Sequence, residues 1–267
     1  MQNPKSFVER IYYDGTREYT KRQGEIVYLD GSRLARPADM PRTQRLIALV
    51  IIIVAIGVGL FMVDHFVFSK WRESADAEKT VAANLAREGS LETIPQVASF
   101  INLDNDAIKA TLDTAGYTMY DASNSNNATD LLLYRIPSDI QASEAASLFM
   151  KGVNSLDAVE ASKLLNGSWS FEADRVGGTS MVVRYADFGT SDPQVAVQKA
   201  FENQGFDSAS VSDSGIDESG NTFMMGTVDA GGKPCSWKIS GLPLDEIYSI
   251  SGLPTDACYV GIRVTAQ

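Results

Sequence analysis

The chain has 267 residues, 44% of them hydrophobic and 21% charged, a composition typical of folded domains. Its formal net charge of −11 is unevenly spread, because residues 69–267 carry fourteen cations and twenty-seven acids. Such an acidic region is repelled by phosphates, which argues against nucleic acid or anionic lipid as its partner, although the same charge also keeps an exposed domain soluble.

Residues 1–45 form a basic N-terminal segment with a short internal repeat. Tyr12-Tyr13-Asp14-Gly15 recurs sixteen residues later as Tyr28-Leu29-Asp30-Gly31. Asp-Gly between β-forming residues favours a tight turn, so each copy predicts a hairpin. Forty-five residues bury little core, and we therefore expect only partial order in this segment.

Residues 46–68 are predicted to form a transmembrane helix. The stretch 46–63 contains no charge and no proline, and apolar residues resume at 66–68 after Asp64 and His65. Eighteen helical residues cover about 27 Å and the whole stretch about 34 Å, enough for a hydrocarbon core of about 30 Å. A buried soluble helix is the alternative, but such helices are rarely apolar all round for this length.

The flanking charges predict the orientation of this helix. Nine cations and six acids precede it, so the N-terminus is expected in the cytoplasm and residues 69–267 outside. A signal peptide cleaved after Ala75-Asp76-Ala77 is the alternative, but the long leading segment and long apolar run favour an uncleaved signal-anchor. Ala55 and Gly59 are small residues four apart, through which two copies could associate as a homodimer.

Beyond a predicted stalk helix at 69–90, the outer region contains a second repeat, with a spacing of 89 residues. Each copy predicts a helix that ends at a glycine and is followed by four strands. We therefore expect an α+β fold in which 91–190 and 191–267 are two related units, each with one helix and a four-stranded antiparallel sheet. A helix-capping pattern that arose twice by chance is the alternative. The matching residues are Ile108, Leu112, Gly116 and Tyr117 in one copy, and Val197, Phe201, Gly205 and Phe206 in the other.

The first copy contains an insertion at 143–165, which is rich in helix formers and predicts two short helices broken near Asn154. The polar loop 124–130 and the acidic loop 213–221 are predicted hairpin connections. Both are candidate recognition tips, because binding residues are often carried on loops.

The chain has two cysteines, Cys235 and Cys258, both in predicted strands of the outer region, where disulfides persist. A disulfide between them would close a loop of about two dozen residues and contribute on the order of 3 kcal/mol. Two free buried thiols are the alternative. We expect no metal site, because two cysteines and the distant His65 cannot supply four ligands.

Catalytic motifs are missing from the sequence. A single histidine excludes Ser-His-Asp and Cys-His arrangements from the outer region, and zinc-protease and nucleotide-binding patterns are absent. We therefore expect no catalytic residue and no cofactor, and predict a non-enzymatic, membrane-anchored binding or scaffold module of the cell envelope whose partner is a protein or another envelope component. The alternatives are a carboxylate-based hydrolase or transferase acting on envelope polymers, which needs only two placed acids, and a transmembrane sensor.

Overall fold

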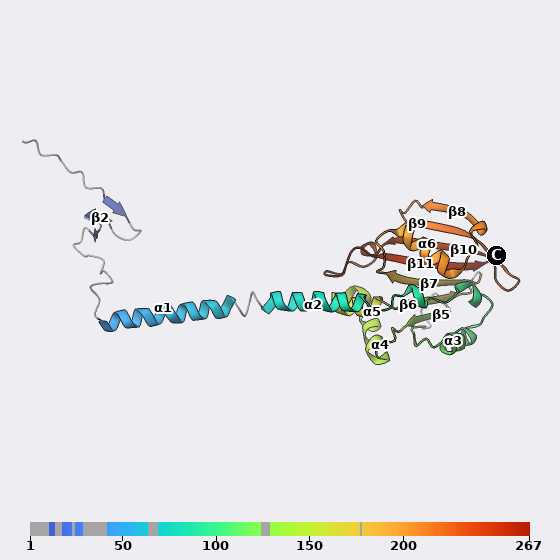
Figure 1. Cartoon of the computed structure of the whole chain (residues 1–267), viewed down its shortest axis with the longest axis horizontal. Coiled ribbons are helices and arrows are strands. Elements are labelled where there is room, and N and C mark those ends of the chain that lie inside the picture. Colours follow the sequence, from blue (N-terminus) through green and yellow to red (C-terminus); the bar gives the residue numbers. More distant parts are fainter. Residues whose placement is uncertain are drawn as a thin grey trace, which may run out of the picture. The chain divides into compact units, whose positions relative to one another are not determined.

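Figure 1 shows a computed structural model of the chain. It describes residues 11–13, 18–22, 25–28, 42–63, 69–123, 129–176 and 178–267. The chain divides into two compact units, Met1–Trp71 and Arg72–Gln267.

The first unit contains a small antiparallel sheet, in which β1 (Ile11–Tyr13) pairs with β2 (Glu18–Arg22) and β2 with β3 (Glu25–Tyr28). The strands β1 and β2 flank the first Asp-Gly turn, as the sequence predicts, although residues 14–17 lie outside the described part of the chain. The second Asp-Gly turn, at 30–31, also lies outside the described residues. The hairpin between β2 and β3 was not predicted.

The helix α1 (Arg42–Val63) contains most of the predicted transmembrane segment, and residues 64–68 lie outside the description. Its described large apolar side chains are exposed within the unit, from 62% at Leu46 to 50% at Met62. Among the helices that the structure describes, none meets both the length and the apolarity that a membrane crossing requires. The transmembrane prediction is therefore not confirmed by the structure.

The helix α2 (Ser69–Leu85) covers most of the predicted stalk, and all of it from Arg72 onward belongs to the second unit. Its end is fixed by polar contacts to α5 (Ala158–Leu165) and to the residues between α5 and β6. Asn84 donates hydrogen bonds to the Val159 carbonyl and the Ser162 hydroxyl, and the Asn166 amide donates to the Asn84 carbonyl. The Ser90 hydroxyl then donates to the Ser168 carbonyl at 2.8 Å.

Eight strands of the second unit form one antiparallel sheet in the order β4-β5-β6-β7-β11-β10-β9-β8 (Figure 1). This sheet and the helices packed on it confirm the predicted α+β class. The strands are β4 (Met119–Asp121), β5 (Leu131–Arg135), β6 (Trp169–Asp174), β7 (Ser180–Asp187), β8 (Val211–Ile216), β9 (Thr222–Asp229), β10 (Pro234–Pro243) and β11 (Cys258–Ala266).

The prediction of two separate four-stranded sheets needs a correction. The last strand of each half, β7 and β11, pair with each other from Ser180↔Thr265 to Asp187↔Cys258. The two predicted sheets are therefore halves of one continuous sheet. Pairing these strands removes two edges whose backbone groups would otherwise lack partners, which gives a physical reason for the union.

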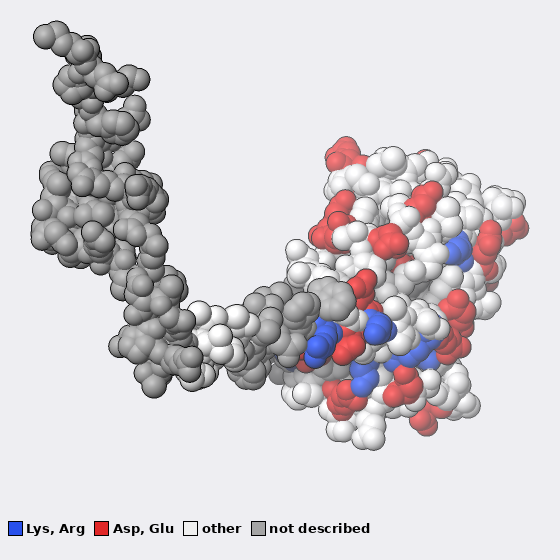
Figure 2. Space-filling model, turned by 60° about the vertical axis from the view of Figure 1, so that its left-hand side comes forward, with Lys and Arg blue, Asp and Glu red and all other residues white. Residues whose placement is uncertain are grey.

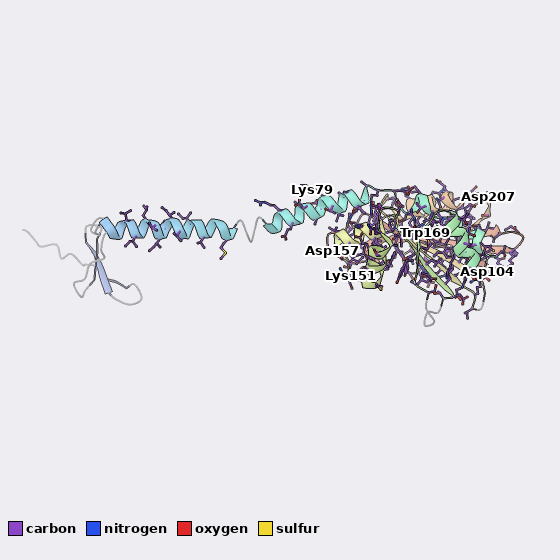
Figure 3. The ribbon with its side chains drawn as sticks, turned by 90° about the horizontal axis from the view of Figure 1, so that it is seen from below. Lys79, Asp104, Lys151, Asp157, Trp169 and Asp207 are labelled. Atoms are coloured by element: carbon purple, nitrogen blue, oxygen red, sulfur yellow. The ribbon has the colours of Figure 1, made fainter. Side chains whose placement is uncertain are left out.

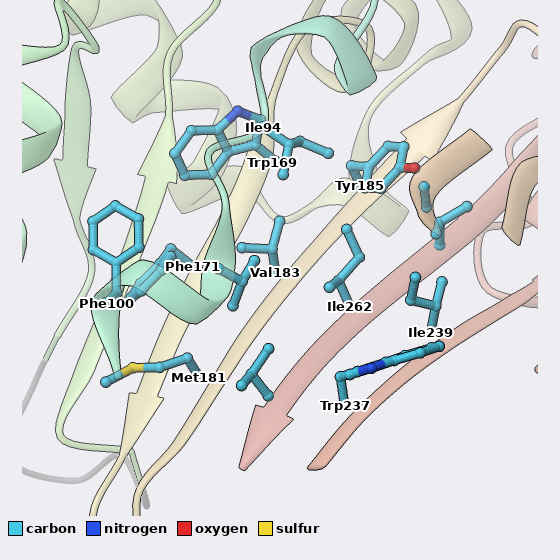
Figure 4. Packing of buried hydrophobic residues seen from close by; sticks show 14 of the residues in the cluster. Ile94, Phe100, Trp169, Phe171, Met181, Val183, Tyr185, Trp237, Ile239 and Ile262 are labelled. Carbon is cyan, nitrogen blue, oxygen red and sulfur yellow. The ribbon is translucent and has the colours of Figure 1, made fainter. Parts of the chain in front are cut away.

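Helices and 3₁₀ turns cover one face of the sheet, here called the helix-covered face. The helix α6 (Pro193–Gln204) packs on β9, β10 and β11, and η4 (Val97–Phe100) packs on β7 and β11. Strand side chains alternate between faces, so every second residue enters this core. Figure 4 shows several of these residues, which include Trp169, Phe171, Met181, Val183, Tyr185, Trp237, Ile239 and Ile262.

The apolar repeat residues of both helices are buried. Ile108 and Leu112 of α3 (Asn105–Thr114) are fully buried, while Val197 and Phe201 of α6 are 2% and 7% exposed. Each side chain faces the core, as the sequence pattern predicts.

The glycines and aromatic residues after these helices also correspond. Gly116 and Gly205 follow their helices with φ of +83° and +66°, a left-handed conformation that glycine adopts easily. The next residue then meets a tryptophan on the third strand of its own half. The rings of Tyr117 and Trp169 meet edge to face with their centroids 5.5 Å apart, and the ring of Phe206 stacks on Trp237 with the centroids 4.6 Å apart.

The predicted insertion forms α4 (Ala142–Lys151), η5 (Val153–Ser155) and α5 (Ala158–Leu165). Asp157 begins α5 in a capping box with Glu160, close to Lys151, which pairs with the same glutamate (Figure 3). The insertion covers part of the second face of the sheet, where Phe149 stacks on Tyr134 at 4.7 Å. The loop 244–257 joins the same apolar cluster, so only part of this face stays open.

Candidate functional site

The structure corrects the predicted disulfide. Cys235 and Cys258 are both free and buried. They lie on the paired strands β10 and β11, as expected, but Cys235 is opposite Ala266 and Cys258 is opposite Pro243. Pro243 is eight positions along β10 from Cys235, roughly 27 Å at about 3.4 Å per residue. A disulfide needs Cα atoms within about 7 Å, so this pair cannot form one.

The acidic segment 213–221, a predicted recognition tip, lies at the edge of the sheet. It contains most of β8 and the turn into β9. Within the described residues β8 pairs only with β9, so its outer backbone N–H and C=O groups have no neighbouring strand. A register shift between Val211 and Asp213 interrupts the ladder at one end and leaves Ser214–Ile216 as regular edge. The other predicted tip, 124–130, lies mostly outside the described residues.

A groove of about 710 Å³ runs between this edge strand and α6. Its outer wall consists of Ser214 and Ile216, which share a sheet face with Met224 and Thr222 because they pair with them directly. Its inner wall is the exposed side of α6, including Val195 and Glu202. The helix lies over the middle of this half of the sheet, so the outermost strands extend beyond it (Figure 1).

Two large apolar side chains face each other across the groove without being buried. Ile216 is 73% exposed on the strand side and Val195 is 42% exposed on the helix side. Exposed apolar residues that converge in one groove often mark an interaction site, whereas isolated ones are common on any surface.

The rim of the groove is acidic. Asp192, which caps α6, and Glu202 line it together with a single cation, Lys199. Asp213 is exposed on β8, on the side away from the groove, because it pairs with Met225. Figure 2 shows that acidic side chains are spread over one face of the second unit. Basic side chains on a partner would therefore favour its binding at this edge.

The turn after β8 is held by Asp217. Its carboxylate accepts hydrogen bonds from the backbone N–H groups of Ser219 and Asn221, at 3.1 and 3.0 Å. Desolvation raises the pKa of Asp217, but these hydrogen bonds and the charge of Lys238 outweigh it and lower the pKa below its ordinary value. The ionised carboxylate thus fixes the end of the edge strand.

A carboxylate-based enzyme would use a pair of placed acids. Among the buried polar residues that the structure describes, Asp187 is the only acid, 8% exposed. Its Oδ1 accepts a hydrogen bond from the Gly189 N–H. Its Oδ2 and the Tyr185 hydroxyl have no hydrogen-bond partner within the described part of the chain. Burial raises the pKa of Tyr185, and nearby Asp187 adds to the effect. A tyrosine beside a single acid is not the two-carboxylate arrangement of glycoside hydrolysis.

The comparisons with known proteins returned no match: no family model, no curated protein and no solved structure is similar to the chain.

The groove was not predicted from the sequence. Val195 and Ile216 are 21 positions apart, and only the placement of α6 beside β8 brings them together. The one sequence feature that pointed to this place is the acidic loop at 213–221.

Proposed function

We propose that the chain is a non-enzymatic, membrane-anchored module of the cell envelope that binds an extended segment of another protein by strand addition at β8. The observation that carries this proposal is the open edge of β8 beside the groove lined by Val195 and Ile216. In strand addition, main-chain hydrogen bonds to a free edge give affinity and pockets for alternate side chains give specificity.

The geometry defines the chemistry of the partner. A strand paired with β8 alternates its side chains between the two faces of the sheet. On the groove side these side chains would meet Ile216 and Val195, so they should be apolar. On the other side they would lie near Asp213, so Lys or Arg is favoured there. The expected partner segment therefore alternates apolar and basic residues.

The membrane anchor in this proposal rests on the sequence. Residues 46–63 carry no charge, and the preceding segment is rich in cations, so we propose that the N-terminus is cytoplasmic and the unit Arg72–Gln267 extracytoplasmic. We also propose that the two halves of the sheet arose by duplication, supported by the same order of helix and strands and by the matched glycines Gly116 and Gly205.

The binding proposal can be tested by selecting displayed random peptides on the purified full chain. Selected peptides should share an alternation of apolar and basic residues. Ile216→Asp and Val195→Asp should each weaken their binding by about 10-fold or more, since burying such a side chain contributes roughly 1.5 to 3 kcal/mol. Val176→Asp is the matched control, because Val176 is 76% exposed and lies in the turn before β7, in the other half of the sheet.

Two results would contradict this proposal. One is that no alternating pattern is enriched; the other is that Ile216→Asp and Val176→Asp bind the selected peptides equally well. If the chain instead associates with itself, and Ile216→Asp abolishes that association, the occupant of the edge is a second copy and the proposed partner is wrong.

The orientation needs its own experiment. An engineered thiol at the exposed Ser251 should react with a membrane-impermeant maleimide on intact cells, while one at Ser6 should not. The native cysteines are buried and give little background. Labelling at Ser6 alone would reverse the proposed placement.

A further inference from the structure

Three cations cluster on the open face of the sheet, opposite to the helix-covered face. Arg184, Lys238 and Arg263 line a hollow of about 320 Å³. They share this face because the neighbours of each along its strand, such as Ile262 and Val264 on either side of Arg263, enter the core of the other face. We call these three residues the cationic cradle.

The register brings the cradle together around a glycine. Lys238 on β10 is directly opposite Arg263 on β11. One step along the sheet, Gly261 lies between Arg184 on β7 and Ser240 on β10. Because Gly261 has no side chain, the sheet is open to the backbone at this point, and the cationic side chains surround that opening.

Neighbouring acids balance two of the three charges of the cradle, and the third, on Arg263, has no acid paired with it among the described residues. Arg184 forms an ion pair with Glu172, and Lys238 lies 3.5 Å from Asp217 and over the ring of Phe223. For Arg263, no ion pair or hydrogen bond of the side chain occurs among the residues that the structure describes. Like charges directly opposite each other on a sheet are unfavourable, so the juxtaposition of Lys238 and Arg263 works against stability unless an anion lies between them.

The position of the cradle is unusual for this chain. The region 69–267 has only fourteen cations against twenty-seven acids, yet three of those cations gather in one hollow. The Ser240 hydroxyl also lines it, as do the carboxylate of Asp217 and the Asn221 amide that donates to this carboxylate. Guanidinium groups, an ammonium group and neutral donors around an open backbone form a donor set suited to an oxyanion.

We propose that the cationic cradle binds a phosphate group in the hollow over Gly261. The guanidinium of Arg263 supplies the charge that no protein group compensates, Lys238 acts as a second positive charge, and the Ser240 hydroxyl donates from the floor. The site lies on the face opposite the groove and is independent of strand addition at β8. The phosphate can belong to a soluble molecule or to a lipid headgroup, and the chemistry of recognition is the same.

The proposal is tested by isothermal titration calorimetry of the full chain in a neutral detergent at low salt, with inorganic phosphate as the probe. Binding should be saturable. Arg263→Gln and Lys238→Gln should each weaken it about 10-fold or more, and Arg263→Lys should fall between Arg263→Gln and the wild type, because it keeps the charge but not the planar donor fork. Gly261→Ala changes no charge but places a methyl group 3.4 Å from the Ser240 hydroxyl, so it should also weaken binding.

Lys233→Gln is the matched control, since Lys233 is an exposed cation in the turn before β10 and outside the cradle. Ile216→Asp should leave phosphate binding unchanged, which separates this site from the groove. A second arm uses vesicles that contain phosphatidylglycerol. Binding to vesicles that Arg263→Gln removes, without binding of free phosphate, would identify a headgroup as the source. The absence of saturable binding in both arms, or an equal loss in Lys233→Gln, would overturn the proposal.

Discussion

The two halves of the eight-stranded sheet share one order of elements but differ in what covers them. The first half contains the insertion α4–α5, whose Phe149 packs on the second face of the sheet. The outer edge of this half is the three-residue strand β4. In the second half, the described residues contain no α-helix between the strands, and the outer edge is the six-residue strand β8. An open hollow lies on the second face of the sheet, where this half joins β7. The groove therefore lies in the half without the insertion, and the cationic cradle lies where the two halves join, with Arg184 from β7 and its other two cations from the second half.

This difference separates the residues that build the fold from those that are free to bind. Among the positions shared by the halves, the pairs Leu112 with Phe201 and Trp169 with Trp237 are buried in the core. The groove and the cationic cradle use positions that the shared pattern leaves unspecified. The buried positions of the two halves can thus follow one pattern while their surface positions differ.

The largest expected effect comes from removing the matched core residues. Leu112→Ala should lower the free energy of unfolding by about 2 to 5 kcal/mol and Phe201→Ala by about 3 to 5 kcal/mol, because both side chains are buried. Since β7 pairs with β11, we expect each substitution to shift one common transition. Urea unfolding followed by fluorescence measures this, because Trp169 reports on one half and Trp237 on the other.

Val176→Ala serves as the control for these two substitutions. Its side chain is 76% exposed, so the change should stay within about 0.5 kcal/mol. Two separate transitions, each moved by only one of the core substitutions, would show that the halves fold independently despite their shared sheet.

A smaller effect is expected in the hairpin of the edge strand. A Cβ at Gly226 would lie 2.2 Å from the Ser210 carbonyl oxygen and 2.7 Å from the Trp237 ring, so Gly226→Ala forces the start of β8 away from β9. We expect a loss of about 1 to 3 kcal/mol, as for overpacked cores, and faster amide hydrogen exchange in β8. The same change at Gly215, where the nearest atom would be 3.9 Å away, should stay within about 0.5 kcal/mol. Equal effects at the two glycines would contradict the close packing of Ser210 on β9.

The elements that the sequence predicts well are those set by local patterns. Four-residue spacing placed Ile108 and Leu112 on the buried side of α3, and the following glycine marked the end of that helix. Such features depend on neighbours within one or two turns, so a single sequence contains the information.

The elements that the sequence missed depend on contacts between distant segments. Cys235 and Cys258 lie on adjacent strands, but only the register shows that they are at opposite ends. The pairing of β7 with β11, and the position of α6 beside β8, likewise follow from how the halves pack. Periodicity assigns a residue to a face, but it does not fix the position of one strand along another.

The smallest expected effect concerns the two cysteines. Cys258 is the first residue of β11 and is buried. Burial raises the pKa of Cys258 to about 11, with Asp187 and Asp192 adding to the effect and Lys199 opposing it. Burial likewise raises the pKa of Cys235. The native chain should therefore resist iodoacetamide at pH 8, and denaturation without reductant should expose two reactive thiols. Fewer than two would show that a disulfide forms despite the register.

The same pKa predicts a dependence of stability on pH. The Cys258 thiol has an ordinary pKa of 9.0 and a pKa of about 11 in the folded chain, so the unfolded chain ionises first as pH rises. Its contribution to stability is complete below pH 9 and is lost as pH rises toward 11. Buried tyrosines such as Tyr185 also favour folding in their neutral form, so the wild type is compared with Cys258→Ala. The variant should lose less stability than the wild type across this range, and parallel curves would mean that Cys258 titrates at its ordinary pKa in the folded chain.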